Sequence, residues 1–388
     1  MSVWLLPENI ADILPREARL IEKLRREFLE LVTSHGFEQV RPPLIEYVDS
    51  LSSGTDGNLD LRTFKIIDQS SGRLLGLRAD MTPQIARIDA HILNRSGITR
   101  LSYAGSLLHA RPLHPMASRE PYVSGVELFG STNRNSDLEV ISLGVKALHR
   151  IGIENVHLDL GHTAVVRSVL SKDSETPKYV EKILYALSHK DSALLKELAG
   201  CISDKTIEDL LKIIHTFGDE SALDELDQYF ADQSAIRKAI EEVRWLAQHS
   251  GAEQVSFDFA DVHGYQYLTG VTFSVTIPKR FQAVMRGGRY DDIGAKFGRM
   301  RPAVGFTIYL REIASLMETR RPYAILAPGD VEDPGLKAKV DALRESGNIV
   351  VTRLPEDTIA SLEEAFRLDE ELVFENGIWQ LKYRSETN

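Results

Sequence analysis

The apolar positions of the first hundred residues follow a helical period and then an extended one. Residues 16–35 carry an apolar side chain every three or four positions, which predicts an amphipathic helix that ends at Gly36. Extended runs within residues 63–84 predict a hairpin. The dipeptide Thr82-Pro83 is typical of a helix start, and we expect this helix to continue to Ala90.

A second, longer hairpin is the clearest extended pattern in the chain. Two apolar runs, Leu101–Leu108 and Tyr122–Phe129, are separated by a basic loop that contains proline. We expect a charged helix at Ser136–Ile151 and then a strand at Val156–Leu160. From about residue 171 to 250 the pattern is amphipathic and rich in Lys, Glu and Leu, which predicts a helical insertion.

Strand patterns return after the insertion and continue to a short basic segment near Thr319. Beyond this segment we expect a strand, a helix at Gly335–Ser346, a strand at Asn348–Arg353, a short helix and a closing hairpin. The chain is therefore expected to divide into a larger domain over residues 1–320 and a small α/β domain over residues 321–388.

Composition narrows the class of protein. A chain of 388 residues with 43% hydrophobic and 27% charged residues is typical of a soluble globular protein with a sizeable core. The net charge of −11 disfavours nonspecific binding to nucleic acid. We find neither a signal peptide nor a run of ~20 apolar residues, and we expect a cytoplasmic protein. The single cysteine, Cys201, allows no intramolecular disulfide, and the histidine spacing suggests no metal site.

Several polar residues stand in patterns that suit ligand binding. Glu127 lies among apolar residues in the long hairpin, and burying a carboxylate without a partner costs several kcal/mol. Glu127 therefore either binds a ligand or forms a structural salt bridge. Asp80 and Thr82 are typical of a helix N-cap, and this role is compatible with ligand binding.

The segment from Gly287 to Asp292 offers a second candidate. Gly287 and Gly288 permit a close approach of the backbone to a small ligand. Tyr290 supplies a flat ring and a hydroxyl group that suit an imidazole. The alternative is a hairpin turn at the two glycines.

Taken in order, these segments resemble the motifs of class II aminoacyl-tRNA synthetases in the histidine-specific form. Leu108–Pro112 resembles the second class motif and Pro302–Glu312 the third, whereas Val262–Gly270 and Gly287–Asp292 resemble the two histidine signatures. The resemblance covers residues 1–320. It implies an α+β fold with an antiparallel sheet flanked by helices, a helical insertion and a small C-terminal α/β domain.

The residues that hold histidine in those synthetases are largely matched. The resemblance implies that Asp80 and Thr82 contact the amino group of histidine. The remaining candidates are, for the histidine pocket, Glu127, Tyr267 and Tyr290 and, for a possible extension of it, Arg111, His263, Gly287 and Gly288. One departure is Val123, which replaces a glutamine that contacts the amino group, and histidine affinity stays open for this reason.

The positions that handle ATP in the synthetases have changed together. In this chain Leu108 replaces the arginine that binds the α-phosphate in the synthetases, and Ala110 replaces the glutamate that pairs with that arginine. His263 replaces the catalytic arginine of the synthetases, and its imidazole cannot take over the role of a forked guanidinium group. At the positions that contact adenine in the synthetases, Tyr309 replaces a glycine and Glu312 replaces the arginine that stacks on the base.

The neighbouring Arg311 lies one position early, which on a helix turns its side chain by about 100°. A charged contact deleted from a buried polyphosphate site costs about 2–5 kcal/mol, so three lost cations would cost on the order of 6–15 kcal/mol. We therefore expect a groove without the guanidinium groups that hold ATP, and no adenylation.

A synthetase-like fold with a histidine pocket and a changed ATP site is similar to the ATP phosphoribosyltransferase regulatory subunits. The resemblance implies a non-catalytic chain without a cofactor. Its expected partners are a short-form catalytic subunit and L-histidine as effector, in a homodimer within a hetero-octamer, without nucleic acid or membrane. The alternatives are a scaffold with a vestigial pocket, an amino-acid-activating ligase, and an active histidyl-tRNA synthetase.

Overall fold

The computed structural model describes residues 4–51, 57–278, 280–329 and 332–384. The chain forms two compact units. The larger contains the described residues up to Ile13 and Ile21–Leu316, and the smaller contains Leu14–Leu20 and the described residues from Met317 onward. Helix α1 (Pro15–Ser34) contributes to both, and it matches the helix expected from the apolar period. In the described part of the chain, no helix combines the length and the apolar character needed to cross a membrane.

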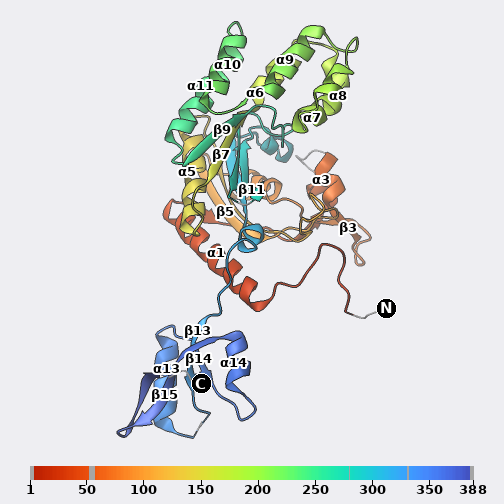
Figure 1. Ribbon diagram of the computed structural model, residues 1–388. Helices are drawn as coiled ribbons and strands as arrows, with labels where there is room; N and C mark the ends of the chain where they lie inside the picture. Colours follow the sequence, from red (N-terminus) through yellow and green to blue (C-terminus); the bar gives the residue numbers. More distant parts are fainter. Residues whose placement is uncertain (1–3, 52–56, 279, 330–331, 385–388) are drawn as a thin grey trace. The chain divides into compact units, whose positions relative to one another are not determined.

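The larger unit is built on a central sheet with the strand order β1-β5-β6-β12-β11-β10-β7-β9-β8 (Figure 1). Most neighbouring strands are antiparallel, whereas β1 pairs with β5 and β7 with β9 in parallel. The expected long hairpin is confirmed as β5 and β6. The strands are β1 (Glu38–Gln39), β5 (Thr99–Ser106), β6 (Tyr122–Phe129), β7 (His157–His162), β8 (Phe217–Gly218), β9 (Gln254–Asp258), β10 (Val271–Ile277), β11 (Arg280–Arg289) and β12 (Ala303–Tyr309).

Helices α1 and α5 (Arg134–Arg150) cover one face of this sheet. Phe28 of α1 meets Phe306 of β12 edge to face, with 6.2 Å between ring centroids. Gly144 lets α5 approach β11 so closely that an added Cβ would lie 2.7 Å from the sulfur of Met285. Alternate residues of a strand point to opposite faces of the sheet, so Gly305, next to Phe306, lies on the face away from these helices. The opposite face of the sheet is thus left for a cavity.

The hairpin expected within residues 63–84 is confirmed, and it belongs to a separate small sheet in the order β2-β4-β3. Its strands are β2 (Ile45–Tyr47), β3 (Phe64–Ile67) and β4 (Leu74–Leu77), and the short helices α2 (Val48–Leu51) and α3 (Gly57–Arg62) lie between β2 and β3. Helix α4 (Thr82–Arg87) starts at the expected residue. It continues past Ala90 as a π-helical stretch, η1 (Ile88–Leu93), which ends at Asn94 with a left-handed φ of 44°.

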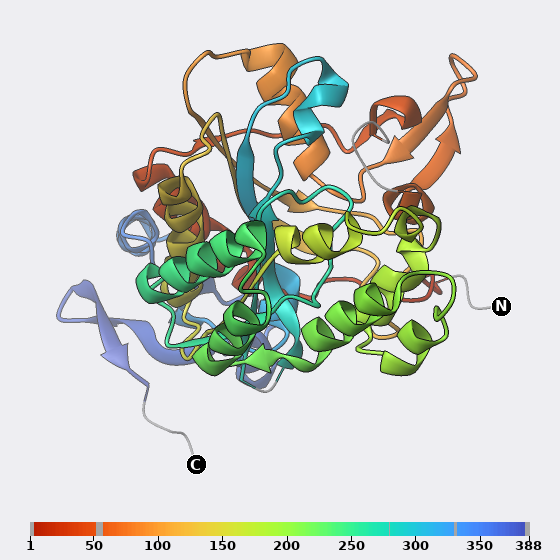
Figure 2. The same cartoon turned by 90° about the horizontal axis from the view of Figure 1, so that it is seen from above.

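The segment expected to be a helical insertion is predominantly helical, and its helices gather at one end of the larger unit (Figures 1 and 2). It also contributes β8, which pairs with β9 at the edge of the central sheet. A strand of two residues is too short to show a period, so the sequence could not reveal it. Helix α6 (Thr163–Leu170) lies just before this segment, and the helices within it are η2 (Thr176–Lys178), α7 (Val180–Ser188), α8 (Ser192–Lys196), α9 (Asp204–His215), α10 (Glu220–Tyr229) and α11 (Ser234–His249).

The smaller unit has a mixed sheet in the order β14-β13-β15-β16 with a helix packed on each face. Alternate residues of β13 explain this layering: Ile325 faces the core with α13, whereas Leu326 faces the core with α14. The expected order of elements is confirmed as β13 (Tyr323–Ala327), α13 (Pro334–Glu345), β14 (Val350–Thr352), α14 (Ile359–Ala365), β15 (Arg367–Glu375) and β16 (Ile378–Tyr383).

Candidate functional site

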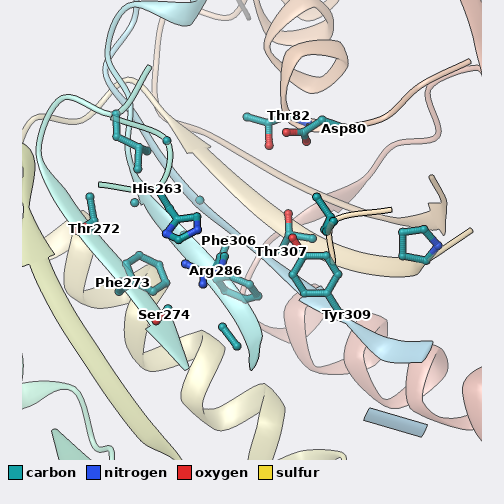
Figure 3. Close-up of a pocket in the computed structure, with 18 of the residues that line it drawn as sticks. Asp80, Thr82, His263, Thr272, Phe273, Ser274, Arg286, Phe306, Thr307 and Tyr309 are labelled. Atoms are coloured by element: carbon teal, nitrogen blue, oxygen red, sulfur yellow. The ribbon is translucent and has the colours of Figure 1, made fainter. Parts of the chain in front are cut away.

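A cavity of about 770 Å³ lies on the sheet face opposite α1 and α5 (Figure 3). Its wall combines β6, β10, β11 and β12 with the start of α4 and the loop between β5 and β6. Every residue that the sequence analysis assigned to the pocket lines this one cavity: Asp80, Thr82, Arg111, Glu127, His263, Tyr267, Gly287, Gly288 and Tyr290. The structure thus brings together residues that lie up to 210 positions apart, and their binding role stays a prediction.

Glu127 is the centre of the polar contacts in the cavity. Its side chain is 1% exposed, and three hydroxyl groups donate hydrogen bonds to its carboxylate. Thr82 and Tyr103 donate to Oε1 at 3.0 and 3.3 Å, and Tyr290 donates to Oε2 in a short bond. None of these three donors is a cation, so these hydrogen bonds do not form the structural salt bridge that was considered for Glu127.

Burial dominates the protonation of Glu127. Desolvation raises the pKa of this carboxyl to about 8, although the hydrogen bonds from Tyr290 and Thr82 favour the ionised form. Burial likewise raises the pKa of the Tyr290 hydroxyl well above its usual value, so this group remains a proton donor at neutral pH. A carboxyl group that is protonated near pH 7 can donate to a neutral ring nitrogen or, once ionised, accept from a charged ring.

Gly305 is a residue of the site that the sequence analysis missed. It pairs with Glu127 across β12 and β6, and the carboxylate folds over it. A Cβ at position 305 would lie 1.7 Å from Glu127 Oε2, so a side chain here would displace the carboxylate. The signal was present in the segment Ala303–Phe306, where a single glycine interrupts an apolar strand.

Asp80 and Thr82 lie at the start of α4, where the N-cap position is Met81 and no side chain caps the helix, and their binding role stays a prediction. Asp80 Oδ1 accepts a hydrogen bond from the backbone N–H of Thr82 at 3.0 Å, as expected for a residue that caps a chain turn. Both side chains also line the cavity, on the side of α4 (Figure 3). This turn contact holds the backbone of Thr82, and the Thr82 hydroxyl donates to Glu127.

The glycine pair is not a hairpin turn, because Gly287 and Gly288 lie inside β11. The next residue, Arg289, is structural: it is 7% exposed and forms a salt bridge of 2.7 Å with Asp137 of α5. Burial raises the pKa of Asp137 to about 6 even though Arg289 favours its ionised form. The ion pair ties β11 to the helix layer, and Tyr290 is then presented to the cavity.

Tyr309 and Glu312 occupy the far part of the cavity wall. Tyr309 pairs with Val123 across the strands, and it packs against the buried cluster that contains Val123. Burial raises the pKa of the Tyr309 hydroxyl, which is therefore neutral at physiological pH. Glu312 of α12 (Leu310–Ala314) forms a short ion pair with Arg280 of β11.

Arg62, Arg280 and Arg286 line the cavity together with the expected Arg111, so the cavity has guanidinium groups although the arginines at the ATP positions of the synthetases are replaced. The motif comparison considered only the positions that hold ATP in the synthetases, and these arginines come from other positions. His263 is 61% exposed and its Nδ1 bonds to Asp261, which also lies 3.4 Å from Arg286. Burial would raise the pKa of Asp261, but His263 and Arg286 lower it well below its usual range.

Arg311 points away from the cavity, as its position on the helix predicts. It is 8% exposed and donates to the carbonyl oxygens of Glu120 and Ala11, each at 3.0 Å, and to Ser118 at 3.2 Å. It therefore holds the loop between β5 and β6 in place. Within the described residues, no group of three His, Cys, Asp or Glu side chains is arranged to hold a metal ion.

Comparisons with known proteins agree with this geometry. A family model described as histidyl-tRNA synthetase matches residues 9–313, and one described as ATP phosphoribosyltransferase subunit HisZ C-terminal domain matches residues 321–382. The ATP phosphoribosyltransferase regulatory subunit of Burkholderia multivorans is 45% identical over 386 residues, which are 99% of this chain and 100% of that protein. The chain belongs to the family of ATP phosphoribosyltransferase regulatory subunits.

Further relatives give the same result. The regulatory subunit of Nitrosospira multiformis is 44% identical over 98% of both chains. A crystal structure from Bacillus halodurans, described as an ATP phosphoribosyltransferase regulatory subunit/histidyl-tRNA synthetase, has a TM-score of 0.82 at 24% identity and covers 95% of this chain and 97% of its own. A histidyl-tRNA synthetase from Nostoc has a TM-score of 0.78 at 17% identity, with 96% and 92% covered. These structures confirm the class II synthetase-like fold, and the family places the chain in the regulation of histidine biosynthesis.

Proposed function

We propose that this chain binds L-histidine in the cavity around Glu127 and transmits the occupancy of this cavity to a separate, short-form ATP phosphoribosyltransferase catalytic subunit. Family membership supports the regulatory part of the proposal. Histidine binding is supported by the buried carboxyl group of Glu127 on the cavity wall, which accepts hydrogen bonds from three hydroxyl groups. A site that can both donate and accept a proton suits an imidazole, which has one ring nitrogen of each kind.

The amino group of the ligand has a partner of opposite charge in Asp80. Its carboxylate lines the same cavity, and its backbone contact with Thr82 keeps it beside Glu127. Val123 supplies no amide to this group, since it is fully buried in an apolar cluster. We expect the loss of that contact to weaken histidine binding without abolishing it.

The chain itself carries no chemistry in this proposal. Adenylation requires ATP beside the amino acid, but Tyr309 projects into the cavity, and Glu312 stands where the synthetases carry the arginine that stacks on adenine. Arg280 is already committed to Glu312. The phosphoribosyl transfer would therefore belong to the catalytic subunit, with this chain acting as a dimer within a hetero-octamer.

Histidine would act by shifting an equilibrium between an activating and an inhibiting assembly. Such a shift requires different affinities for the two states, and a coupling of about 1–3 kcal/mol is typical. The proposal is tested with the co-purified complex of this chain and the short-form catalytic subunit. Calorimetric titration gives histidine affinity, and the rate of phosphoribosyl transfer is measured with and without histidine.

We expect the complex to be faster than the catalytic subunit alone and to lose rate when histidine binds. The complex with Glu127→Gln should keep the acceleration and lose the response to histidine. Acceleration without any histidine binding to this chain would favour a scaffold with a vestigial pocket, and Val123 is the observation that favours it. Histidine-dependent exchange of pyrophosphate into ATP by the pure chain would contradict the non-catalytic role.

A further inference from the structure

Arg286 faces the cavity from the same side of the sheet as Glu127. The strand register shows this: Glu127 pairs with Gly305, and Gly305 pairs with Gly288. Arg286 lies two positions before Gly288 on β11, and residues two apart on a strand share a face. Figure 3 shows its guanidinium group in the cavity, with Ser274 and Thr307 from the neighbouring strands beside it.

The space between Glu127 and Arg286 matches a small amino acid. The two residues are separated by β12, which places their Cα atoms roughly 12 Å apart for a strand spacing of about 4.8 Å and a rise of about 3.3 Å per residue. On this face Gly305 and Gly288 lie beside Glu127 and add no side chain, and Thr307, which pairs with Arg286, adds only a small one. Two side chains that reach toward each other leave room for a ligand with a ring at one end and a charge at the other.

The guanidinium group of Arg286 retains donor capacity. Its Nη1 is 3.4 Å from Asp261 Oδ2, which is longer than a charge-assisted hydrogen bond, and the side chain is 37% exposed. The other oxygen of Asp261 is bonded to His263. By contrast, Arg280 is only 12% exposed and is held by Glu312. Of these two arginines, Arg286 has the looser ion pair.

A bound amino acid brings an α-carboxylate that must find a cation inside the cavity, since a buried unpaired charge is costly. His263 is a poor candidate, because its ring is largely exposed and turned to Asp261. We propose that Arg286 binds the α-carboxylate of the ligand and so selects a free amino acid over the corresponding amine or alcohol. This inference rests on the proposed histidine site and adds to it the group that distinguishes the end product from its relatives without a carboxylate.

The test is calorimetric titration of the full chain with L-histidine, histamine and L-histidinol. Histamine and histidinol keep the imidazole and the amino group and lack the carboxylate. For the unaltered chain we expect histidine to bind about 10- to 100-fold more tightly than histamine, since a charge-assisted pair is lost. Arg286→Gln should reduce histidine affinity to within about threefold of histamine and leave histamine affinity unchanged.

Arg280→Gln is the matched control, because it removes a guanidinium group of the same cavity and should preserve the preference for histidine. Arg286→Lys keeps the charge without the fork, and an intermediate preference is expected. If Arg286→Gln keeps the full preference for histidine over histamine, the proposed role of Arg286 is overturned and the proposed histidine site still stands. Failure of the unaltered chain to bind histidine would overturn the proposed function and this inference together. Thermal melting of each variant checks folding, and Arg286→Lys decides the question if Arg286→Gln does not fold.

Discussion

The two parts of the cavity differ in how their polar groups are used. Around Glu127, hydroxyl groups of Thr82 and Tyr290 converge on one buried carboxyl group. In the far part, Tyr309 occupies space, and Glu312 is neutralised by Arg280 within the wall itself. The strands beneath both parts belong to one sheet, so the difference lies in side chains. One sheet can therefore carry two differently built parts of a cavity, and we expect that the two can be altered independently.

The largest effect should follow from Glu127→Gln. A glutamine cannot ionise, so we expect histidine affinity to fall by more than about 100-fold as the charge-assisted contact is lost. Calorimetric titration measures the change. Glu312→Gln removes a carboxylate from the far part and should leave histidine affinity within about threefold. Equal losses in both variants would contradict the independence of the two parts.

At alkaline pH the Glu127→Gln variant should be more stable than the unaltered chain. Because the pKa of Glu127 is raised to about 8 in the folded chain, its contribution to stability is fully present below its unfolded pKa, near 4.5, and is lost as the pH rises through about 8. Glu127→Gln removes this loss, and we expect a gain of about 1–3 kcal/mol in the free energy of unfolding at pH 8. Urea unfolding at pH 5 and pH 8 measures the gain, which should be smaller at pH 5.

Gly305→Ala should move the Glu127 carboxylate without removing it. The new methyl group would lie 1.7 Å from Oε2, so we expect histidine affinity to fall about 10- to 50-fold and stability to fall by about 1–3 kcal/mol. Gly97→Ala is the control, because an added Cβ there meets nothing within 4 Å. An unchanged affinity in Gly305→Ala would show that the position of the carboxylate is not important for binding.

Histidine affinity should also depend on pH in a defined way. One proton must be shared between Glu127, with its pKa of about 8, and the ligand imidazole, with a pKa near 6.5. Above pH 8 both are deprotonated, so binding must take up a proton and affinity should fall by up to about tenfold per pH unit. Below pH 6.5 both are protonated and binding must release one. Titration from pH 5.5 to 9.5 should give a maximum between these values, and a flat profile would exclude this shared proton.

The smallest effect is expected for Tyr309→Phe in the far part. The hydroxyl group is removed and the ring remains, so histidine affinity should change by less than about twofold. Calorimetric titration is again the measurement. A tenfold loss would show that the far part of the cavity also holds the ligand, and the comparison between the two parts would have to be revised.

The periodic elements were predictable, because each depends on neighbours in the chain. Helix α1, the two hairpins and the element order of the smaller unit follow from apolar periods and turn residues. The gathering of Asp80, Glu127 and Tyr290 was anticipated only through family resemblance, since a local pattern says nothing about which distant strands pair.

The parts that were missed depend on strand register. Gly305 and Arg286 share a sheet face with Glu127 because of the pairing of β6, β12 and β11, and this pairing is set by contacts across the whole sheet. Arg289 could not be separated from the ligand-binding residues of its motif, because its partner Asp137 lies 152 positions away. Arg62 and Arg280 were missed for the same reason, since they reach the cavity from segments outside the motifs that were compared.

The central sheet ends on both sides in very short strands, β1 with Glu38–Gln39 and β8 with Phe217–Gly218. Exposed edges of long strands invite another chain to add a strand, and shortened edges suppress that kind of polymerisation. A regulatory subunit that pairs with a different, catalytic protein gains from this restriction. At these two edges, association by added strands is disfavoured, and side-chain complementarity is left to decide the partner.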